Sequence, residues 1–473
     1  MLALHLENEF VGCKPLHTGS VQLGTAHSGT FWHYRFLTTL PQRGKLPTLR
    51  YEFRSESTYV SPKTAIPKDE VCIVRSASAS VALGFTLAFL LGLGVVAAPR
   101  ANAQTFTVIH SFTGGSDGAN PLGGFFIVGD YLYGTASSGG SSGVGVVFRV
   151  SLSGEETVLH EFSGGTDGAS PQGHLVMDKD GNFYGTTNAG GVSNAGTVFK
   201  VTRKGVETVL YSFTGMPDGA NPVAGLAIDK AGNLYGTTTA GGSSGNGTVF
   251  KLAIPTVTGG EWTEEVLHSF GTGTDGTIPI AGVTFDASGK LYGTTSAGGS
   301  YGYGAVFQLT PSTPSWTESI LHNFELGSDG GVPYAGLVLY GGNFYGATTE
   351  GGAGGQNGGG TIFELKNASG AWTFSELYGL SGWGIAGSYR NLLVVSGKIY
   401  ATTHCDGQNN AGTVYELSLS SGVWNYDPLY VFTGGSDGLY SISNLVADKA
   451  GNLYGVTLYG GADGSGVAFK VAP

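Results

Sequence analysis

The side chains best suited to chemistry lie in one stretch late in the chain. They include aromatic rings, a cation, an amide, an imidazole and a carboxylate, namely Trp383, Tyr389, Arg390, Asn391, His404 and Asp406. Aromatic platforms with directional hydrogen-bond donors are typical of carbohydrate and peptide sites. An imidazole near a carboxylate can also serve in general acid–base catalysis, but the sequence does not show whether His404 contacts Asp406. We therefore predict a ligand-binding site and no catalytic residue.

Four histidines would make a metal site if folding gathered them, namely His110, His160, His268 and His322. Each occupies the same place in a repeated segment, where other copies carry tyrosine. Equivalent places lie on different repeat units, so the four imidazoles cannot converge on one ion.

The aspartates that recur once per copy are too sparse for a calcium site, which needs six to eight oxygens. Residues 178–182 resemble a calcium loop, but the downstream glutamate ligand is missing. We expect turns at these places, no bound metal and no cofactor.

These residues are positioned by a motif that recurs along residues 104–473. Its best copy contains Leu234-Tyr235-Gly236-Thr237-Thr238 and Gly247-Thr248-Val249-Phe250, and its tyrosine returns at intervals of 51 to 57 residues, at Tyr133, Tyr184, Tyr235, Tyr292, Tyr345, Tyr400 and Tyr454. Each copy holds four short β-type segments separated by glycine-rich turns. Four strands per period of about 50 residues indicate a β-propeller blade.

The two ends of the repeat region indicate a closed ring. Residues 106–112 match a fourth strand with no blade before it, and residues 467–471 match a third strand with no fourth strand after it. Pairing these two segments completes the last blade and removes an exposed edge. The sequence thus predicts an all-β fold, a seven-bladed β-propeller of four-stranded blades closed by its N-terminal strand.

In such a ring the first strands lie nearest the axis, and the loops that follow second and fourth strands share one face. The sixth copy departs most from the motif, and its changes fall in these loops. Residues at aligned axial positions of other copies, including Tyr334 and His174, would face the same depression. The predicted ligand site therefore contains Trp383, Tyr389, Arg390, Asn391, His404, Asp406, Tyr334 and His174. The alternative is neutral drift in a degenerate copy.

The motif resembles the GloVer (Gloeo/Verruco) tandem-repeat family of exported bacterial proteins. The resemblance rests on Leu-Tyr-Gly-Thr-Thr at 234–238, Gly-Gly at 241–242, Gly-Thr-Val-Phe at 247–250, Ser-Phe at 212–213 and Asp-Gly at 218–219. It covers about residues 106–473 and implies export and display at the cell surface or outside the cell. It brings no established activity with it. The chain lacks the C-terminal sorting helix of anchored members, which favours a soluble exported form.

The segment before the repeats predicts export as well. Residues 81–98 are an apolar run, preceded by Arg75 and followed by Ala101-Asn102-Ala103, the pattern of a signal peptide cleaved after Ala103. We interpret 71–103 as this leader and 1–70 as a disordered, non-native extension of the chain. A transmembrane anchor is the alternative reading of the apolar run.

Composition and charge exclude several classes of function. Glycine accounts for 83 of 473 residues, yet 41% of the chain is hydrophobic, enough to fill a large core. The net charge of −11, without a basic patch, argues against a nucleic-acid partner. We predict a secreted, periplasmic or cell-surface monomer without stable membrane insertion, a non-catalytic module for an unknown glycan or protein. The alternatives are a polysaccharide hydrolase or lyase with a site near blade six, and a structural surface repeat protein.

Overall fold

The computed structural model describes residues 104–472 except 258, 314, 353–357, 369, 381–387 and 408, together with the backbone of three short strands near the N-terminus. The chain divides into two compact units, Met1–Val96 and Ala97–Pro473. The first unit contains one antiparallel sheet of β1 (Ser20–Leu23), β2 (Phe31–Arg35) and β3 (Arg54–Glu56). The predicted leader at 71–103 and the rest of 1–70 lie outside the described residues. The described residues contain no helix able to cross a membrane.

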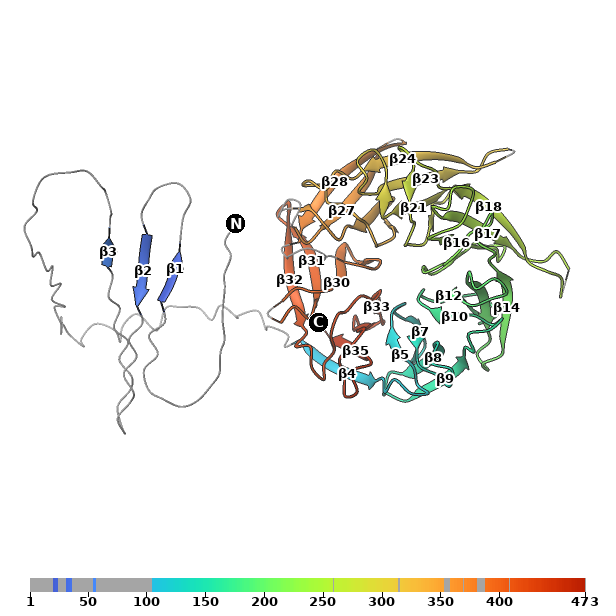
Figure 1. Cartoon of the computed structure of the whole chain (residues 1–473), viewed down its shortest axis with the longest axis horizontal. Coiled ribbons are helices and arrows are strands. Elements are labelled where there is room, and N and C mark those ends of the chain that lie inside the picture. The colour runs from blue at the N-terminus through green and yellow to red at the C-terminus, as the bar shows by residue number, and fades with distance from the viewer. Residues whose placement is uncertain are drawn as a thin grey trace, which may run out of the picture. The chain divides into compact units, whose positions relative to one another are not determined.

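The second unit is a ring of seven antiparallel sheets, and in the first six the strands follow the chain from the inner to the outer strand (Figure 1). Blade one contains β6 (Phe126–Val128), β7 (Tyr131–Ser138), β8 (Val146–Ser151) and β9 (Glu156–Glu161), and blade two contains β11 (Val176–Met177), β12 (Phe183–Ala189), β13 (Thr197–Val201) and β14 (Glu207–Ser212). Blade three contains β15 (Ala227–Ile228), β16 (Leu234–Thr238), β17 (Thr248–Ala253) and β18 (Thr263–Ser269), and blade four contains β20 (Thr284–Phe285), β21 (Leu291–Thr295), β23 (Ala305–Thr310) and β24 (Thr317–Asn323).

The remaining blades follow the same plan. Blade five contains β25 (Val338–Tyr340), β26 (Asn343–Ala347), β27 (Thr361–Ala368) and β28 (Ala371–Gly379), and blade six contains β29 (Leu393–Val395), β30 (Lys398–Thr402), β31 (Thr413–Ser420) and β32 (Val423–Val431). Four short additional strands precede or extend blades one, two and four, namely β5 (Ala119–Pro121), β10 (Ala169–Pro171), β19 (Gly276–Thr277) and β22 (Ala297–Gly298).

Blade seven closes the ring by joining the two ends of the repeat region. It contains β33 (Val446–Ala447), β34 (Leu453–Val456), β35 (Val467–Ala472) and, as its outermost strand, β4 (Thr105–Ser111). The register of this closure places Phe469 opposite Val108 and Val467 opposite Ser111. The prediction of a seven-bladed propeller closed by its N-terminal strand is confirmed.

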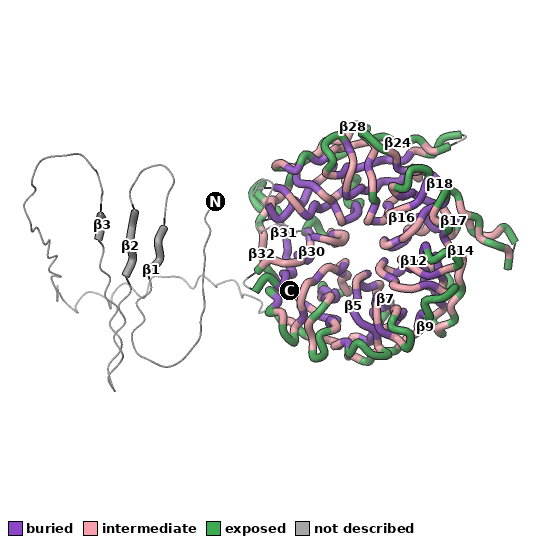
Figure 2. Tube along the Cα trace, in the orientation of Figure 1, coloured by how far each residue is buried: buried purple, intermediate pink, exposed green. Residues whose placement is uncertain are grey.

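The hydrophobic core lies between neighbouring blades. In one cluster Tyr184 of blade two packs with Leu234 and Phe250 of blade three, and Figure 2 shows the buried positions running along the inner strands of the ring. A Cβ atom at Gly236 would come 2.7 Å from the Phe250 ring. The glycine of each Tyr-Gly-Thr segment therefore leaves room for the buried aromatic residue of the next strand.

The recurring aspartates form turns, as predicted. Asp229 accepts hydrogen bonds from the backbone N–H groups of Ala231 and Asn233 and from the Tyr235 hydroxyl. Asp178 binds its own turn in the same way. These side chains fix the bend between first and second strands and are not arranged around an ion site.

The loops after second and fourth strands share one face, as predicted. The Gly140 N–H donates to the Gly115 carbonyl at 2.8 Å, and Gly191 donates to Gly165 at 2.9 Å. Each bond joins a Gly-Gly loop to the loop that enters the same blade. This face carries the axial site described next.

Candidate functional site

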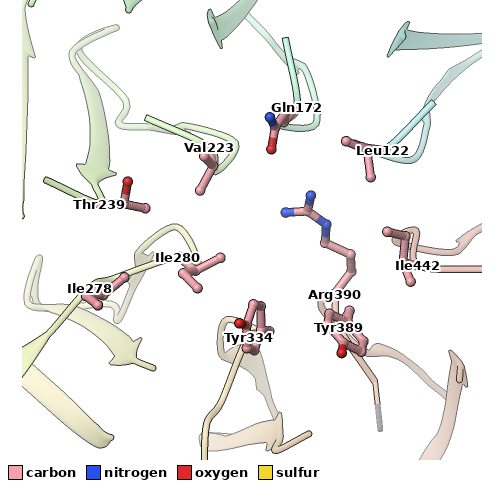
Figure 3. Close-up of a pocket in the computed structure, with 10 residues that line it drawn as sticks. All are labelled: Leu122, Gln172, Val223, Thr239, Ile278, Ile280, Tyr334, Tyr389, Arg390 and Ile442. Carbon is pink, nitrogen blue, oxygen red and sulfur yellow. The ribbon is translucent and has the colours of Figure 1, made fainter. Parts of the chain in front are cut away.

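A cavity of about 410 Å³ opens on the ring axis. All seven blades line it, mostly with apolar side chains, and its lining residues are Leu122, Gln172, Val223, Thr239, Ile278, Ile280, Tyr334, Tyr389, Arg390 and Ile442 (Figure 3). Its volume falls within the range of about 300–1,000 Å³ common for small-ligand sites.

A repeated backbone feature aims one side chain per blade at this cavity. In blades one to five the lining residue follows a proline, and the residue before the proline has a positive φ, as at Asn120 and Val332 (φ 54° in both). The N–H of that residue donates to a carbonyl of the preceding blade, Asn120 to Ser465 and Val332 to Tyr303. Each blade's innermost segment is therefore tied to its neighbour, and the next side chain points to the axis.

The wall formed by blades five and six is aromatic. The rings of Tyr334 and Tyr389 lie 5.0 Å apart at 51°, and the ring of His404 lies 4.9 Å from Tyr389. Burial raises the pKa of Tyr389, so its hydroxyl stays protonated at neutral pH. This wall offers apolar ring faces together with hydroxyl groups.

Arg390 supplies the positive charge of the cavity. Figure 3 shows its guanidinium group pointing across the opening toward Gln172 and Leu122. Aligned positions in other blades carry only small residues, for example Ala281 and Ala335. Burial alone lowers the pKa of Arg390 to about 10, so the group is charged at neutral pH, with no carboxylate partner among the described residues. A cation in this state favours an anionic ligand.

His174 contributes a neutral imidazole close to this charge. Burial, followed by repulsion from Arg390, lowers its pKa to about 4. Its ring occupies space beside Gly225, where a Cβ atom would come 2.2 Å from the imidazole. His174 therefore fills the inner wall next to the cationic site and adds no charge at neutral pH.

Asn391 has a structural role that the sequence did not reveal. Its side-chain oxygen accepts the Gly336 N–H at 2.7 Å, and its own N–H donates to the Asn444 side chain at 3.1 Å. Both contacts cross to neighbouring blades. Asn391 thus links blades five, six and seven beside the cavity and is not among its lining residues.

The Asp406 carboxylate is held within its own blade. It accepts hydrogen bonds from the hydroxyls of Thr403 and Tyr426, the latter at 3.4 Å. The ring of His404 meets Tyr440 at 4.3 Å as well as Tyr389. Neither His404 nor Asp406 lines the cavity, so the geometry favours support of the aromatic wall over acid–base catalysis.

The structure thus brings together three of the predicted site residues, Tyr334, Tyr389 and Arg390, with His174 and His404 next to them. Trp383 lies in 381–387, outside the described residues. The site predicted from the sequence did not include the apolar part of the lining, which contains Leu122, Val223, Ile280 and Ile442. Their signal was available, because most of these residues directly follow the proline of their copy.

The repeats match the model of a known family. The model of the Gloeobacter/Verrucomicrobia repeat matches residues 89–295 and 283–473. No curated protein matches the chain.

Several solved structures are similar to this chain at low sequence identity. A putative 6-phosphogluconolactonase from Bacteroides uniformis is 14% identical, with a TM-score of 0.45 over 71% of this chain and 89% of that one. A puromycin-hydrolyzing peptidase from Mycobacterium tuberculosis is 10% identical, with a TM-score of 0.45 over 72% and 50%. A polysaccharide lyase bound to a GlcA–Rha3S saccharide is 11% identical, with a TM-score of 0.42 over 75% and 94%. Likeness at this level says nothing about function.

Proposed function

This chain belongs to the Gloeobacter/Verrucomicrobia repeat family, and we propose that its propeller is a non-catalytic module that binds an acidic saccharide in the axial cavity. The observation that carries the proposal is the unpaired, half-buried Arg390 beside Tyr334 and Tyr389. Its guanidinium group would hold a carboxylate or sulfate of the sugar.

The chemistry of the cavity matches such a ligand in two respects. A guanidinium group binds a carboxylate through two parallel, charge-assisted hydrogen bonds, which removes the cost of a buried unpaired cation. Tyrosine rings cover the apolar face of a sugar ring, and their hydroxyls, with the Gln172 amide, meet its polar edge. A concave cavity of this size suits a small saccharide better than a folded protein, whose interface needs about 800 Å² on each partner.

Binding is favoured over hydrolysis by the residues that line the cavity. Glycoside hydrolysis usually needs two carboxyl groups about 5–10 Å apart. The described lining includes no aspartate or glutamate. A lyase reaction would need a base beside Arg390. The experiment below would reveal such a reaction through the formation of an unsaturated product.

Export is part of this proposal. Residues 71–103 would act as a leader removed after Ala103, delivering the propeller to the periplasm, the cell surface or the medium, where polysaccharides occur. N-terminal sequencing of the protein recovered from outside the cytoplasm tests this part. A mature chain that starts elsewhere than Gln104 would contradict it.

Calorimetry with glucuronate and galacturonate oligosaccharides, and with neutral oligosaccharides of equal length, tests the binding site. We expect the acidic set to bind and Arg390→Ala to weaken it by about 10- to 100-fold, the loss expected for a charge-assisted hydrogen bond worth about 1.5–3 kcal/mol. Arg203→Ala is the matched control, because Arg203 is exposed and is not among the residues that line the cavity.

Three outcomes would overturn the proposal. They are equal affinity for neutral and acidic sugars, unchanged binding by Arg390→Ala, and steady formation of an unsaturated or hydrolysed product. The last outcome would make the protein an enzyme of the lyase or hydrolase class.

A further inference from the structure

A second cluster of reactive side chains lies at the outer boundary between blades three and four. His268 is on β18, Asp275 is in the loop that follows β18, and Glu318 is on β24. One potential ligand atom from each lies within 4.8 Å of the other two. The three side chains are only 17–19% exposed. This cluster shares no residue with the lining of the axial cavity and does not depend on the proposed function.

The distances within the cluster are long for hydrogen bonds. His268 Nε2 lies 3.4 Å from Asp275 Oδ2 and 3.6 Å from Glu318 Oε1. Hydrogen bonds to nitrogen usually span about 2.7–3.2 Å. The buried atoms His268 Nε2, Asp275 Oδ1 and Glu318 Oε1 accordingly have no hydrogen-bond partner.

The same distances suit ligands of one ion. Zinc bonds to nitrogen and oxygen of about 2.0–2.2 Å in a tetrahedron place neighbouring ligand atoms about 3.3–3.6 Å apart. A divalent cation at the centre would also satisfy the buried atoms and offset both carboxylate charges.

Two of the three side chains are held in place by their surroundings. The Gly271 N–H donates to Asp275 Oδ2 at 2.6 Å, which fixes that carboxylate. The His268 ring meets the buried Phe270 ring edge-on at 4.8 Å. A β-bulge between β17 and β18 breaks the regular alternation next to His268. A site pre-formed in this way loses little freedom on binding an ion.

Other blade boundaries show that the propeller does not need this arrangement. Between blades two and three, Tyr211 replaces the histidine and donates to Asp218 at 2.7 Å. Between blades four and five, Phe374 takes the place of the glutamate and stacks on His322 at 3.9 Å. In both, the residue at the histidine position bonds directly to the aspartate, and the distance from His322 to Asp329 is 3.0 Å. His268 Nε2, at 3.4 Å from Asp275, makes no such bond, so the fold alone does not explain the His268 cluster.

Boundaries with the same three residue types differ in geometry. His160 lies 3.6 Å from Asp167, and Glu207 occupies the glutamate position on the next blade. Among the described residues, only His268, Asp275 and Glu318 bring three such ligand atoms within reach of one ion. This difference supplies a matched control within the same chain.

We propose that His268, Asp275 and Glu318 bind one divalent first-row transition-metal ion that joins blade three to blade four. One imidazole and two carboxylates suit zinc, manganese or iron(II), and the remaining coordination position would be taken by water. The ion would act as a staple at the rim of the ring.

The test uses the full chain, stripped with a chelator and titrated with Zn²⁺, with bound metal counted by elemental analysis and affinity measured by calorimetry. His268→Tyr and Glu318→Phe introduce residues that sister boundaries already use, so both variants should fold. We expect each to lose one bound Zn²⁺ relative to the unsubstituted chain, with affinity at this site falling at least about a hundredfold, since even second-shell changes cost about 10- to 100-fold.

His160→Tyr is the control and should leave the bound metal unchanged. The proposal fails if the unsubstituted chain holds no more Zn²⁺ than His268→Tyr and Glu318→Phe, or if His160→Tyr loses as much. Thermal unfolding of the unsubstituted chain is a second readout that needs no variant. Zn²⁺ should raise its midpoint, and an unchanged midpoint would also overturn the proposal.

Discussion

Arg390→Ala should make the propeller more stable while it weakens binding of the acidic ligand. The guanidinium group is held in the axial cavity without a carboxylate, and burial lowers its pKa to about 10. Because the folded state disfavours the charged form, the penalty is present at every pH below about 10 and disappears only when the group loses its proton.

The size of the effect follows from that pKa. A fall from the usual value of an arginine to about 10 corresponds to about 3 kcal/mol of unfavourable free energy at neutral pH. Water in the cavity reduces this penalty, and alanine loses the packing of the aliphatic stem. We therefore expect a net gain of about 1–2 kcal/mol for Arg390→Ala. Alanine already occupies the aligned positions 281 and 335, so the backbone accepts it.

The assay is guanidinium chloride unfolding of the unsubstituted chain, Arg390→Ala and the control Arg203→Ala at pH 7, each with and without a galacturonate oligosaccharide. Without ligand, only Arg390→Ala should gain stability. With ligand, only the chains that keep Arg390 should gain. If Arg390→Ala unfolds at a lower denaturant concentration than the unsubstituted chain, the guanidinium group has a stabilising partner and the argument for an anionic ligand is wrong.

Three further predictions concern the scaffold. Val332→Asn should stabilise the propeller by about 1 kcal/mol in denaturant unfolding, because φ of 54° strains a β-branched residue and Asn120 adopts the same angle; a loss of stability would contradict this. Gly236→Ala should cost about 1–3 kcal/mol, because its methyl group would meet Phe250, and an unchanged midpoint would show that the ring can shift. Burial opposes ionisation of Asp229, but hydrogen bonds from Asn233 and other donors outweigh burial and lower the pKa of Asp229 below 3.8. The stability that this carboxylate contributes is therefore present above pH 3.8, and it is lost as the pH falls through the lower pKa of the folded state. Asp229→Ala should thus destabilise the chain more at pH 7 than at pH 2, and an equal loss at both would refute the assignment.

Much of the scaffold could be predicted because its signals are local. Phe250 and Gly236 recur with their neighbours in six of the seven copies, and a tight turn such as that at Asp229 is specified by a few adjacent residues. The prediction of closure needed only one observation. Residues 106–112 match a fourth strand with no blade before it, and residues 467–471 match a third strand with no fourth strand after it. The register of Val108 opposite Phe469 bears it out.

The candidate site could be predicted only in part. Arg390 and Tyr389 stood out because they break the repeat, and both line the cavity. Asn391 broke the repeat as well, yet its amide bonds to the backbone of Gly336 and serves the scaffold. A departure from the motif marks a residue as unusual, but it does not reveal where its side chain points.

The sequence by itself determined the blades and their number, because strand periodicity and turn residues act between neighbours in the chain. It also determined how the ring closes, because the strand missing at one end of the repeats is present at the other. Only the tertiary structure decided which side chains meet. The curvature of the ring places Tyr334 against Tyr389 from different blades, leaves Arg390 with no carboxylate partner in the part of the chain that the structure describes, and sets Glu318 of blade four beside His268 of blade three. Such contacts depend on the packing angle between blades. That angle results from many buried contacts together, so no single segment of the sequence specifies it.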